Sequence, residues 1–276
     1  MSVKKEASGR RSVQVEVEVP GTPEEVWQAI ATGPGISSWF VPAEFEMRDG
    51  KPVALKLNLG PGMESSSPVT AWDPPRRFAM ESSGWVPGSP PIADEWSVEA
   101  RGGGVCVVRV VHSLFASTDD WDNQLEGTES GWPGYFRILR LYLTHFRGQR
   151  SAMMQWMAPA AGTETEAWET LTAALGMKGV SAGERWTAPA GIPVLAGVVE
   201  HVTQSPCNAL LRLDKPGPGV AALGAVNFGG QSMVTLSFYL YGDQAPATVA
   251  RETPLWEAWV QERFPTPAEA SKSESE

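Results

Sequence analysis

The chain has 276 residues, with 22 basic and 32 acidic side chains and a formal net charge of −10. That length fits two domains of about 130 residues, each large enough to bury its own core. The excess of negative charge disfavours nucleic acid and anionic lipid as partners of the chain as a whole, and no apolar run reaches the roughly 20 residues that a membrane span needs.

The two cysteines, Cys106 and Cys207, lie far apart in apolar runs. That placement is typical of buried small apolar residues and does not indicate a disulfide framework. The basic N-terminus is not followed by the apolar segment of a secretion signal. We therefore expect a soluble, cytoplasmic chain without thiol chemistry.

The first predicted element is a strand over residues 13–19, where valines alternate with polar residues. The preceding residues 1–10 are polar and are expected to form a mobile tail. After the strand, Thr22 is a suitable N-cap and Pro23 a suitable first residue for a short helix that ends near the Gly-Pro-Gly turn at residues 33–35.

Residues 44–114 form short alternating runs broken by turn residues, which indicates an antiparallel meander. An acidic loop is expected at 117–130. A long amphipathic helix is then predicted from Gly131 to Arg147, because large apolar residues recur there at helical spacing. This apolar stripe consists of Phe136, Leu139, Leu143 and Phe146.

The beginning of this pattern recurs about 140 residues later. Residues 20–27 (PGTPEEVW) resemble residues 159–168 (PAAGTETEAW), each following an alternating strand. A glycine-led strand at 229–241 and a shorter helix at 254–264 complete the second copy. The sequence thus predicts two tandem domains, at 11–149 and 150–265, with a second mobile tail at 266–276.

The first copy resembles the SRPBCC (START and Bet v 1-like) superfamily, in the branch named after the activator of Hsp90 ATPase. The residues that carry the resemblance are 15–27 (VEVEVPGTPEEVW), 36–39 (ISSW), 72–78 (WDPPRRF), 108–113 (VRVVHS) and 131–132 (GW). The second copy resembles the same pattern more faintly, since it lacks the Trp-Asp-Pro-Pro segment and a clear Gly-Trp before its last helix.

The resemblance implies an α+β protein with two tandem helix-grip domains, each a curved antiparallel sheet around a C-terminal helix. Where such a sheet and helix do not interdigitate, an apolar cavity for a small hydrophobic molecule remains. We expect this cavity in the first domain, while the second domain could be degenerate. The same fold hosts binding proteins, cyclases, hydrolases and co-chaperone modules, so it does not select a function.

The candidate ligand-binding residues are those expected to line or rim the first cavity. They are Trp39, Phe40, Trp85, Trp96, His112, Trp132, Phe136 and Leu139. His112 shares strand parity with two valines and is the one inward polar candidate. For the tryptophans, of which the chain has 12, and for His112, ordinary core packing is the alternative interpretation.

Other chemistry is not indicated. Proline interrupts each Gly-Pro-Gly segment, which argues against a phosphate-binding loop. Three scattered histidines give no metal-ligand spacing. No catalytic residue, cofactor or metal is therefore assigned. A binding protein is the leading hypothesis over an enzyme such as a cyclase or hydrolase, which would need a polar dyad inside the pocket.

Arg137, Arg140 and Arg147 form the one basic stripe, opposite the apolar face of the long helix. A solvated helix face is the ordinary interpretation of such a stripe. The functional alternative is docking of an acidic protein partner, as for a co-chaperone. A tandem pair can imitate a dimer of single domains, so either a monomer or a dimer fits the sequence.

Overall fold

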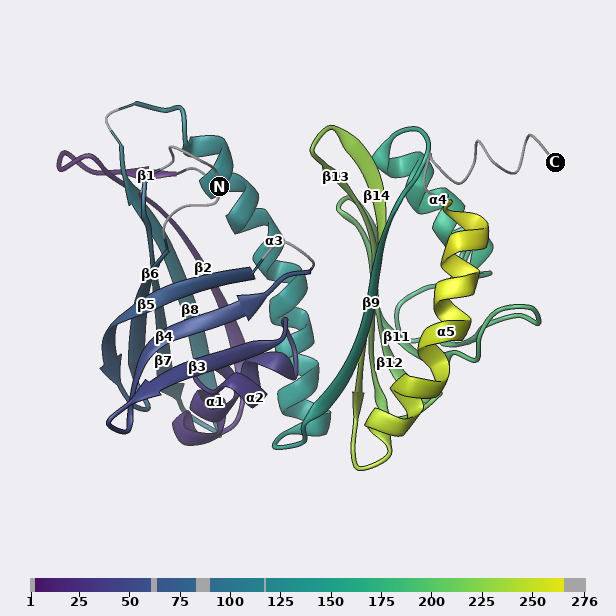
Figure 1. Ribbon diagram of the computed structural model, residues 1–276, viewed down its shortest axis with the longest axis horizontal. Coiled ribbons are helices and arrows are strands. Elements are labelled where there is room, and N and C mark those ends of the chain that lie inside the picture. The colour runs from purple at the N-terminus through teal and green to yellow at the C-terminus, as the bar shows by residue number, and fades with distance from the viewer. Residues whose placement is uncertain (1–2, 61–63, 83–89, 117, 266–276) are drawn as a thin grey trace. The chain divides into compact units, whose positions relative to one another are not determined.

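The computed structural model describes residues 3–60, 64–82, 90–116 and 118–265, except for the side chains of Asn123, Gln124 and Thr128. Within these residues the chain forms two compact units, Met1–Arg150 and Ser151–Glu276. Each unit has one antiparallel sheet and a long helix near its C-terminal end (Figure 1). The predicted α+β class, with tandem helix-grip domains, is confirmed.

The sheet of the first unit has the strand order β1-β2-β8-β7-β6-β5-β4-β3, so the first long strand pairs with the last. Its inner face carries the buried residues of the alternating strands, as the period of two requires. The strands are β1 (Lys4–Lys5), β2 (Arg10–Pro20), β3 (Ala43–Arg48), β4 (Lys51–Asn58), β5 (Glu64–Asp73), β6 (Arg77–Ser82), β7 (Ile92–Arg101) and β8 (Val105–Phe115).

Two short helices follow β2. Helix α1 (Pro23–Ile30) begins with the predicted cap, and Thr22 and Glu25 form a reciprocal capping box there. Helix α2 (Gly33–Ser37) occupies the Gly-Pro-Gly segment that the sequence predicted as a turn. It forms because Thr32 accepts a hydrogen bond from Gly35 N at 3.0 Å, which caps a helix whose second residue is proline.

The long helix α3 (Asp122–Leu141) begins nine residues earlier than the sequence predicted, and it continues as the π-helix η1 (Tyr142–Phe146). Most of the expected acidic loop is therefore helical. The reason is that the apolar stripe extends upstream: Leu125 is fully buried, one heptad before Trp132. Asp122, in the first helical turn, is held by Arg11 at 2.7 Å and by Lys5 at 2.8 Å.

The N-terminal segment also differs from the prediction. Lys4 and Lys5 pair with β2, although residues 1–10 were expected to form a mobile tail. Val3 is buried beside Leu125 in a small core, which explains why this polar segment is held. The predicted tail at 266–276 lies outside the described residues.

The sheet of the second unit has the order β10-β11-β12-β13-β14-β9, again with the first long strand paired to the last. Its elements are β9 (Ser151–Pro159), α4 (Glu164–Ala174), β10 (Arg185–Thr187), β11 (Ala196–Gln204), β12 (Cys207–Lys215), β13 (Gly219–Phe228), β14 (Gln231–Tyr241) and α5 (Ala245–Arg263). Helix α5 lies along one face of the sheet (Figure 1). It begins at Ala245, whereas the predicted helix began at Pro254, so this proline lies inside the helix and not at its start.

The recurrence seen in the sequence corresponds to a structural repeat. Helix α4 follows β9 as α1 follows β2, and Thr163 and Glu166 form the same capping box as Thr22 and Glu25. Trp27 and Trp168, the tryptophans that revealed the repeat, are both buried in their helices. The order strand, short helix, meander, long helix is therefore shared by both units.

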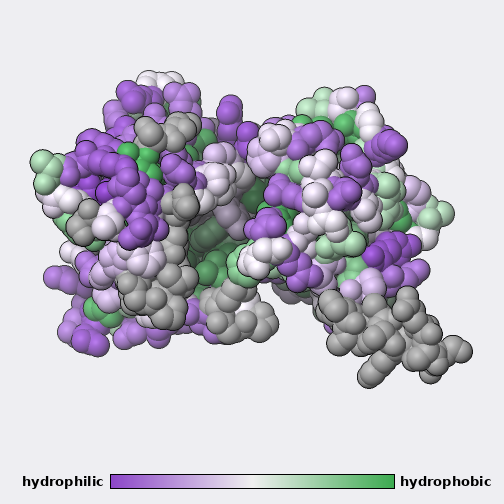
Figure 2. Space-filling model, turned by 90° about the horizontal axis from the view of Figure 1, so that it is seen from above, coloured by the Kyte–Doolittle hydropathy of each residue, from purple (hydrophilic) through white to green (hydrophobic). Residues whose placement is uncertain are grey.

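Buried apolar residues lie between the sheet and the long helix in each unit. In the first, the predicted stripe of α3 and η1 is 0–7% exposed. In the second, one cluster joins α4, α5 and the inner face of the sheet. Hydrophilic residues cover much of the visible face of each unit (Figure 2). Among the residues described, no helix combines the length and apolar composition that crossing a bilayer requires.

Candidate functional site

A buried polar pair lies on the inner face of the first sheet. Asp94 on β7 and His112 on β8 are direct partners in the strand register. Asp94 Oδ1 lies 2.5 Å from His112 Nδ1, and the two residues are only 7% and 4% exposed. Their strand neighbours on this face are apolar, so a carboxylate and an imidazole are enclosed by the core.

Trp132 of α3 completes the arrangement. Its indole N–H donates to His112 Nε2 at 2.5 Å, and the two rings are nearly parallel, with centroids 5.6 Å apart. An indole nitrogen can only donate, so His112 Nε2 must be the unprotonated acceptor. Nδ1 therefore carries the proton and donates it to Asp94. The side chains form a chain of hydrogen bonds from sheet to helix.

Aromatic rings surround this chain of hydrogen bonds. Trp96 packs edge-on against Trp132 with centroids 5.0 Å apart, and Phe136 lies 5.3 Å from Trp132. Trp39 lies 6.3 Å from Trp96, and its own N–H is satisfied by the carbonyl of Ala29 at 2.9 Å. These contacts are typical of aromatic core packing and also of a stacking surface for a ligand.

The aromatic cluster reaches the surface at Phe40 and Tyr135. Phe40 is half-buried and packs against Trp132 at 5.4 Å. Tyr135, which is 36% exposed, stands edge-on to Phe40 with centroids 4.6 Å apart. Phe40 and Tyr135 therefore form the rim of the cluster, and Trp132 lies between this rim and His112.

Most of the predicted ligand-binding residues come together here. Trp39, Phe40, Trp96, His112, Trp132 and Phe136 are linked by ring contacts, and Leu139 is fully buried one turn beyond Phe136. Trp85 lies outside the described residues. Their role in binding a ligand stays a prediction.

Asp94 and Tyr135 were missed by the sequence reasoning. A signal for Asp94 existed, because it occupies an inward position between Ile92 and Trp96 in an alternating strand. A carboxylate on the apolar face of a strand requires a partner. Tyr135 carried no comparable signal, since its position follows from the packing of α3 against Phe40.

The basic stripe is partly engaged within the chain. Arg147 donates to Glu25 Oε2 at 2.7 Å and to the carbonyl of Leu143 at 3.1 Å. Glu25 also accepts a hydrogen bond from Thr22 N, and together these contacts hold the pKa of its carboxyl below the usual range. Arg137 and Arg140 are exposed. The stripe therefore contains one structural arginine and two exposed ones.

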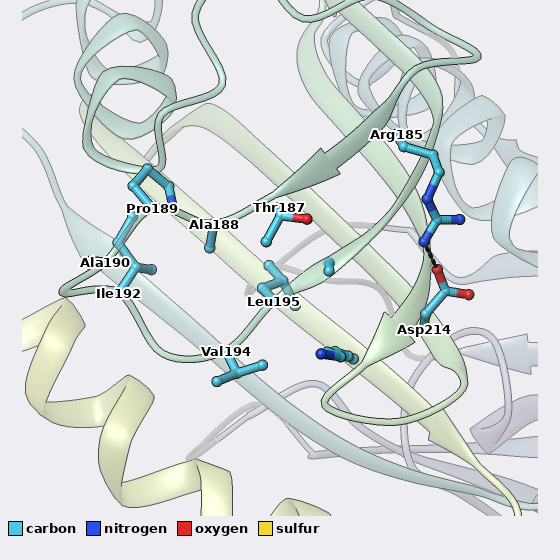
Figure 3. Close-up of a pocket in the computed structure, with 11 residues that line it drawn as sticks. Arg185, Thr187, Ala188, Pro189, Ala190, Ile192, Val194, Leu195 and Asp214 are labelled. Carbon is cyan, nitrogen blue, oxygen red and sulfur yellow. Dashed lines mark hydrogen bonds and ion pairs between the residues drawn. The ribbon is translucent and has the colours of Figure 1, made fainter.

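The second unit has a partly open pocket of about 380 Å³. Arg185 and Asp214 form an ion pair at one side of it, with Nη2 and Oδ2 2.5 Å apart (Figure 3). The remaining walls are mostly the apolar loop before β11. Its lining residues are Arg185, Thr187, Ala188, Pro189, Ala190, Ile192, Val194, Leu195, Ala196, Asp214 and Lys215.

The ion pair at this pocket is well exposed, whereas the Asp94–His112 pair of the first unit is buried. Within the described residues, no cluster of histidine, cysteine, aspartate and glutamate side chains could hold a metal ion. In the first unit, the hydrogen-bonded His112 lies next to the rings of Trp132 and Trp96.

Residues 10–138 match the family model described as "Polyketide cyclase / dehydrase and lipid transport". The match covers most of the first unit and less than half of the chain. A comparison with curated proteins found no matching sequence.

Among solved structures, the chain is similar to DynU16, a putative protein in the dynemicin biosynthetic locus, at 18% identity and a TM-score of 0.40, over 91% of this chain and 96% of that one. It is similar to the di-domain ARO/CYC BexL from the BE-7585A biosynthetic pathway at 12% identity and a TM-score of 0.44, over 93% and 99% of the two chains. Its similarity to the Aha1 dimer from Colwellia psychrerythraea has 19% identity and a TM-score of 0.38, over 50% and 98%. Residues 10–138 of the first unit are thus similar in sequence to the polyketide cyclase/dehydrase (SRPBCC-like) family model.

Proposed function

We propose that the first unit binds a small, mainly apolar molecule between its sheet and α3, with His112 as the polar anchor. The observation that carries this proposal is the Asp94–His112–Trp132 chain of hydrogen bonds inside an aromatic cluster. Ligand sites are typically apolar surfaces with a few well-placed polar groups, and this interior has that composition. The description of the matching family names ligands of this class.

Core packing alone does not explain the hydrogen-bonded Asp94–His112–Trp132 group. An ionisable pair in an apolar core must recover the cost of its desolvation, and apolar residues of similar size often stabilise a fold equally well. If a ligand replaces Trp132 at His112 Nε2, the Asp94–His112 pair contributes to ligand binding as well as to the fold. Such a ligand would supply a hydroxyl or another donor to Nε2 and stack its rings on Trp96 and Phe136.

Entry to the site would pass the rim formed by Phe40 and Tyr135. Trp132, which is 9% exposed, is the side chain between this rim and His112. A rotation of its indole would release His112 Nε2 and open space beside Trp96. In this proposal Trp132 covers His112 in the ligand-free state.

The test is a titration of the full chain with 1-anilinonaphthalene-8-sulfonate, followed by fluorescence, together with native mass spectrometry of protein purified from its host. We expect one saturable probe site in the first unit, weakened at least tenfold by Trp96→Ala. The control is Phe115→Ala, because Phe115 is 63% exposed at the end of β8 and should leave the affinity unchanged. Absence of a saturable site, or equal effects of both variants, would contradict the proposal.

An enzymatic role of the cyclase or dehydrase type is the second candidate, favoured by the Asp94–His112 pair. Once Trp132 moves, His112 Nε2 could take a proton from an acidic C–H of a bound β-dicarbonyl compound, while Asp94 stabilises the resulting imidazolium. The test uses benzoylacetone and follows deuterium uptake at its central carbon. Catalysis predicts a rate above buffer that His112→Gln abolishes even at benzoylacetone concentrations that saturate the variant. If His112→Gln leaves that rate unchanged, the enzymatic role is excluded.

Docking of an acidic partner, as in an activator of Hsp90 ATPase, is the remaining alternative. It now depends chiefly on Arg137 and Arg140, because Arg147 is bound to Glu25. Reversing the charge of Arg137 and Arg140 should abolish any stimulation of an Hsp90 ATPase by the chain. Unchanged stimulation would exclude this surface.

A further inference from the structure

The charged side of the pocket in the second unit lies on the face of the sheet that is turned away from α5. Trp186 of β10 belongs to the buried cluster that also contains Trp256 and Trp259 of α5. Its neighbours Arg185 and Thr187 line the pocket. Side chains alternate between the two faces along a strand, so these two point to the face opposite Trp186. This side of the pocket is therefore outside the space between the sheet and the long helix.

A β-bulge adds two further charged side chains to this pocket. On β11, Ala196 pairs with Lys215 of β12. The next residue, Gly197, pairs with Leu213, so Asp214 is inserted between the two pairs. Glycine permits the close approach of the strands at this point, because an added Cβ on Gly197 would lie 2.1 Å from a carbonyl oxygen of β12. Bulges re-aim side chains relative to a regular strand, and here both Asp214 and Lys215 line the pocket.

The pocket has an excess of positive charge, although the chain as a whole is acidic. Arg185 and Asp214 form an ion pair, and no residue that the structure describes makes an ion pair with Lys215. Arg185 contacts Asp214 through Nη2, which is one part of a guanidinium with five N–H donors. A carboxylate in the pocket would therefore meet two cationic groups and the hydroxyl of Thr187, whereas a cation would meet one carboxylate and two like charges.

The other wall of the pocket is aliphatic. It is the loop of residues 188–195, which is closed at its base by a hydrogen bond from Ala188 N to the carbonyl of Leu195 at 2.8 Å. Pro189 and Ile192 lie across the pocket from the ion pair (Figure 3). Val194, which also lines the pocket, is 56% exposed. None of the described lining residues is aromatic, so this wall suits an aliphatic chain and offers no ring for stacking.

We propose that this pocket binds a short aliphatic carboxylate. The carboxylate accepts hydrogen bonds from the ammonium group of Lys215 and from the guanidinium of Arg185. The alkyl chain lies along the loop and covers Ile192 and Val194, which removes apolar surface of both molecules from water. The pocket volume of about 380 Å³ falls within the range of about 300–1,000 Å³ that is typical of small-molecule sites. This proposal does not depend on the site at His112.

The experiment is a titration of the full chain with sodium octanoate, followed by calorimetry and by the ¹³C-methyl signals of isoleucine. Ile192 is the only isoleucine of the second unit, and Ile192→Val identifies its signal. We expect saturable binding that shifts this signal. Octan-1-ol has the chain without the charge and should bind at least about fivefold more weakly. Acetate has the charge without the chain and should be weaker by at least about tenfold.

Two lysine variants test the charged side of the pocket. Lys215→Gln should weaken octanoate binding about threefold, since an ion pair at an exposed site contributes modestly. The difference from the unmodified chain should shrink at about 1 M salt, where the Debye length is about 3 Å. Lys178→Gln is the matched control and should leave the affinity unchanged. It removes the same charge from an exposed position of the same unit that does not line the pocket.

Three outcomes would overturn the proposal. The first is the absence of a saturable shift of the Ile192 signal, or equal affinities for octanoate and octan-1-ol. The second is an equal effect of Lys215→Gln and Lys178→Gln, which would show that Lys215 has no specific role in binding octanoate. The third is a shift confined to isoleucines of the first unit and lost in Trp96→Ala, which would assign octanoate to the site near His112. The two proposed sites are thus tested separately.

Discussion

Asp94 and His112 face each other across β7 and β8, and their side chains meet at 2.5 Å on the apolar side of the sheet. The second ring nitrogen of His112 is held by Trp132 from α3. One imidazole thus joins two strands and the long helix that covers them. Because each partner fixes one nitrogen, its orientation is determined before any ligand arrives.

The first prediction concerns the tautomer of His112. The indole of Trp132 can only donate, so the Nδ1–H form should be the populated neutral state. Imidazole ¹⁵N shifts of the folded chain should show an unprotonated Nε2 and a protonated Nδ1. His145, which is exposed on η1, provides an internal reference. A proton on Nε2 would mean that Trp132 does not donate to His112.

The second prediction concerns the Trp132 contribution to stability. Trp132→Phe leaves a ring in place but removes the donor to His112 Nε2. A buried acceptor without a partner costs about 1–3 kcal/mol, so the first unit should lose stability by that amount. Urea unfolding followed by NMR signals of the first unit measures it. Tyr135→Phe, at the rim of the same cluster, is the control and should have a much smaller effect.

Local pattern was sufficient to predict part of this architecture. The alternating valines predicted β2, Thr22 and Pro23 predicted the start of α1, and the 3.6-residue period predicted the buried stripe of α3. These features depend on residues that are close in sequence. The inward position of His112 follows from the same kind of local periodicity.

The features that were missed depend on distant partners. Asp94 meets His112 only because β7 and β8 pair in one particular register, which no local pattern specifies. Residues 117–130 were expected to form an acidic loop, and 122–130 of these belong to α3. This part is helical because Leu125 packs in one core cluster with Val3, which precedes β1, and with Leu114 of β8. In residues 122–130, tertiary packing therefore determined the structure more than intrinsic helix propensity did.

The third prediction concerns two glycines, one in α3 and one in α2. Gly131 lies inside α3 on an exposed face, and an added Cβ would meet no atom within 4 Å. Alanine has the higher helix propensity, so Gly131→Ala should stabilise the first unit by about 0.5–1 kcal/mol. Gly35→Ala should have the opposite sign, since its Cβ would lie 1.9 Å from the carbonyl oxygen of Gln28. Urea unfolding of both variants is the measurement, and a destabilised Gly131→Ala would contradict the prediction.

The fourth prediction concerns acid. Hydrogen bonds from Lys5 and Arg11 hold the pKa of Asp122 and that of Asp119 below their usual range. In the unfolded chain an aspartate titrates near about 3.9. The ion pairs therefore stabilise the fold fully above that pH, and the contribution is lost as the pH falls through the lower pKa of the folded state, where protonation releases Lys5 and Arg11.

Asp122→Asn measures this contribution. The variant should be less stable than the unmodified chain at pH 7, and the difference should shrink as the pH falls below about 4, since both proteins then lack the charge. Asp120→Asn is the control, because Asp120 is exposed and accepts a hydrogen bond from Thr118 at 2.7 Å. A difference that stays constant from pH 7 to pH 3 would show that Asp122 acts through packing or capping of α3, and not through its charge. In that case the N-terminal residues would be held chiefly by Val3 against Leu125.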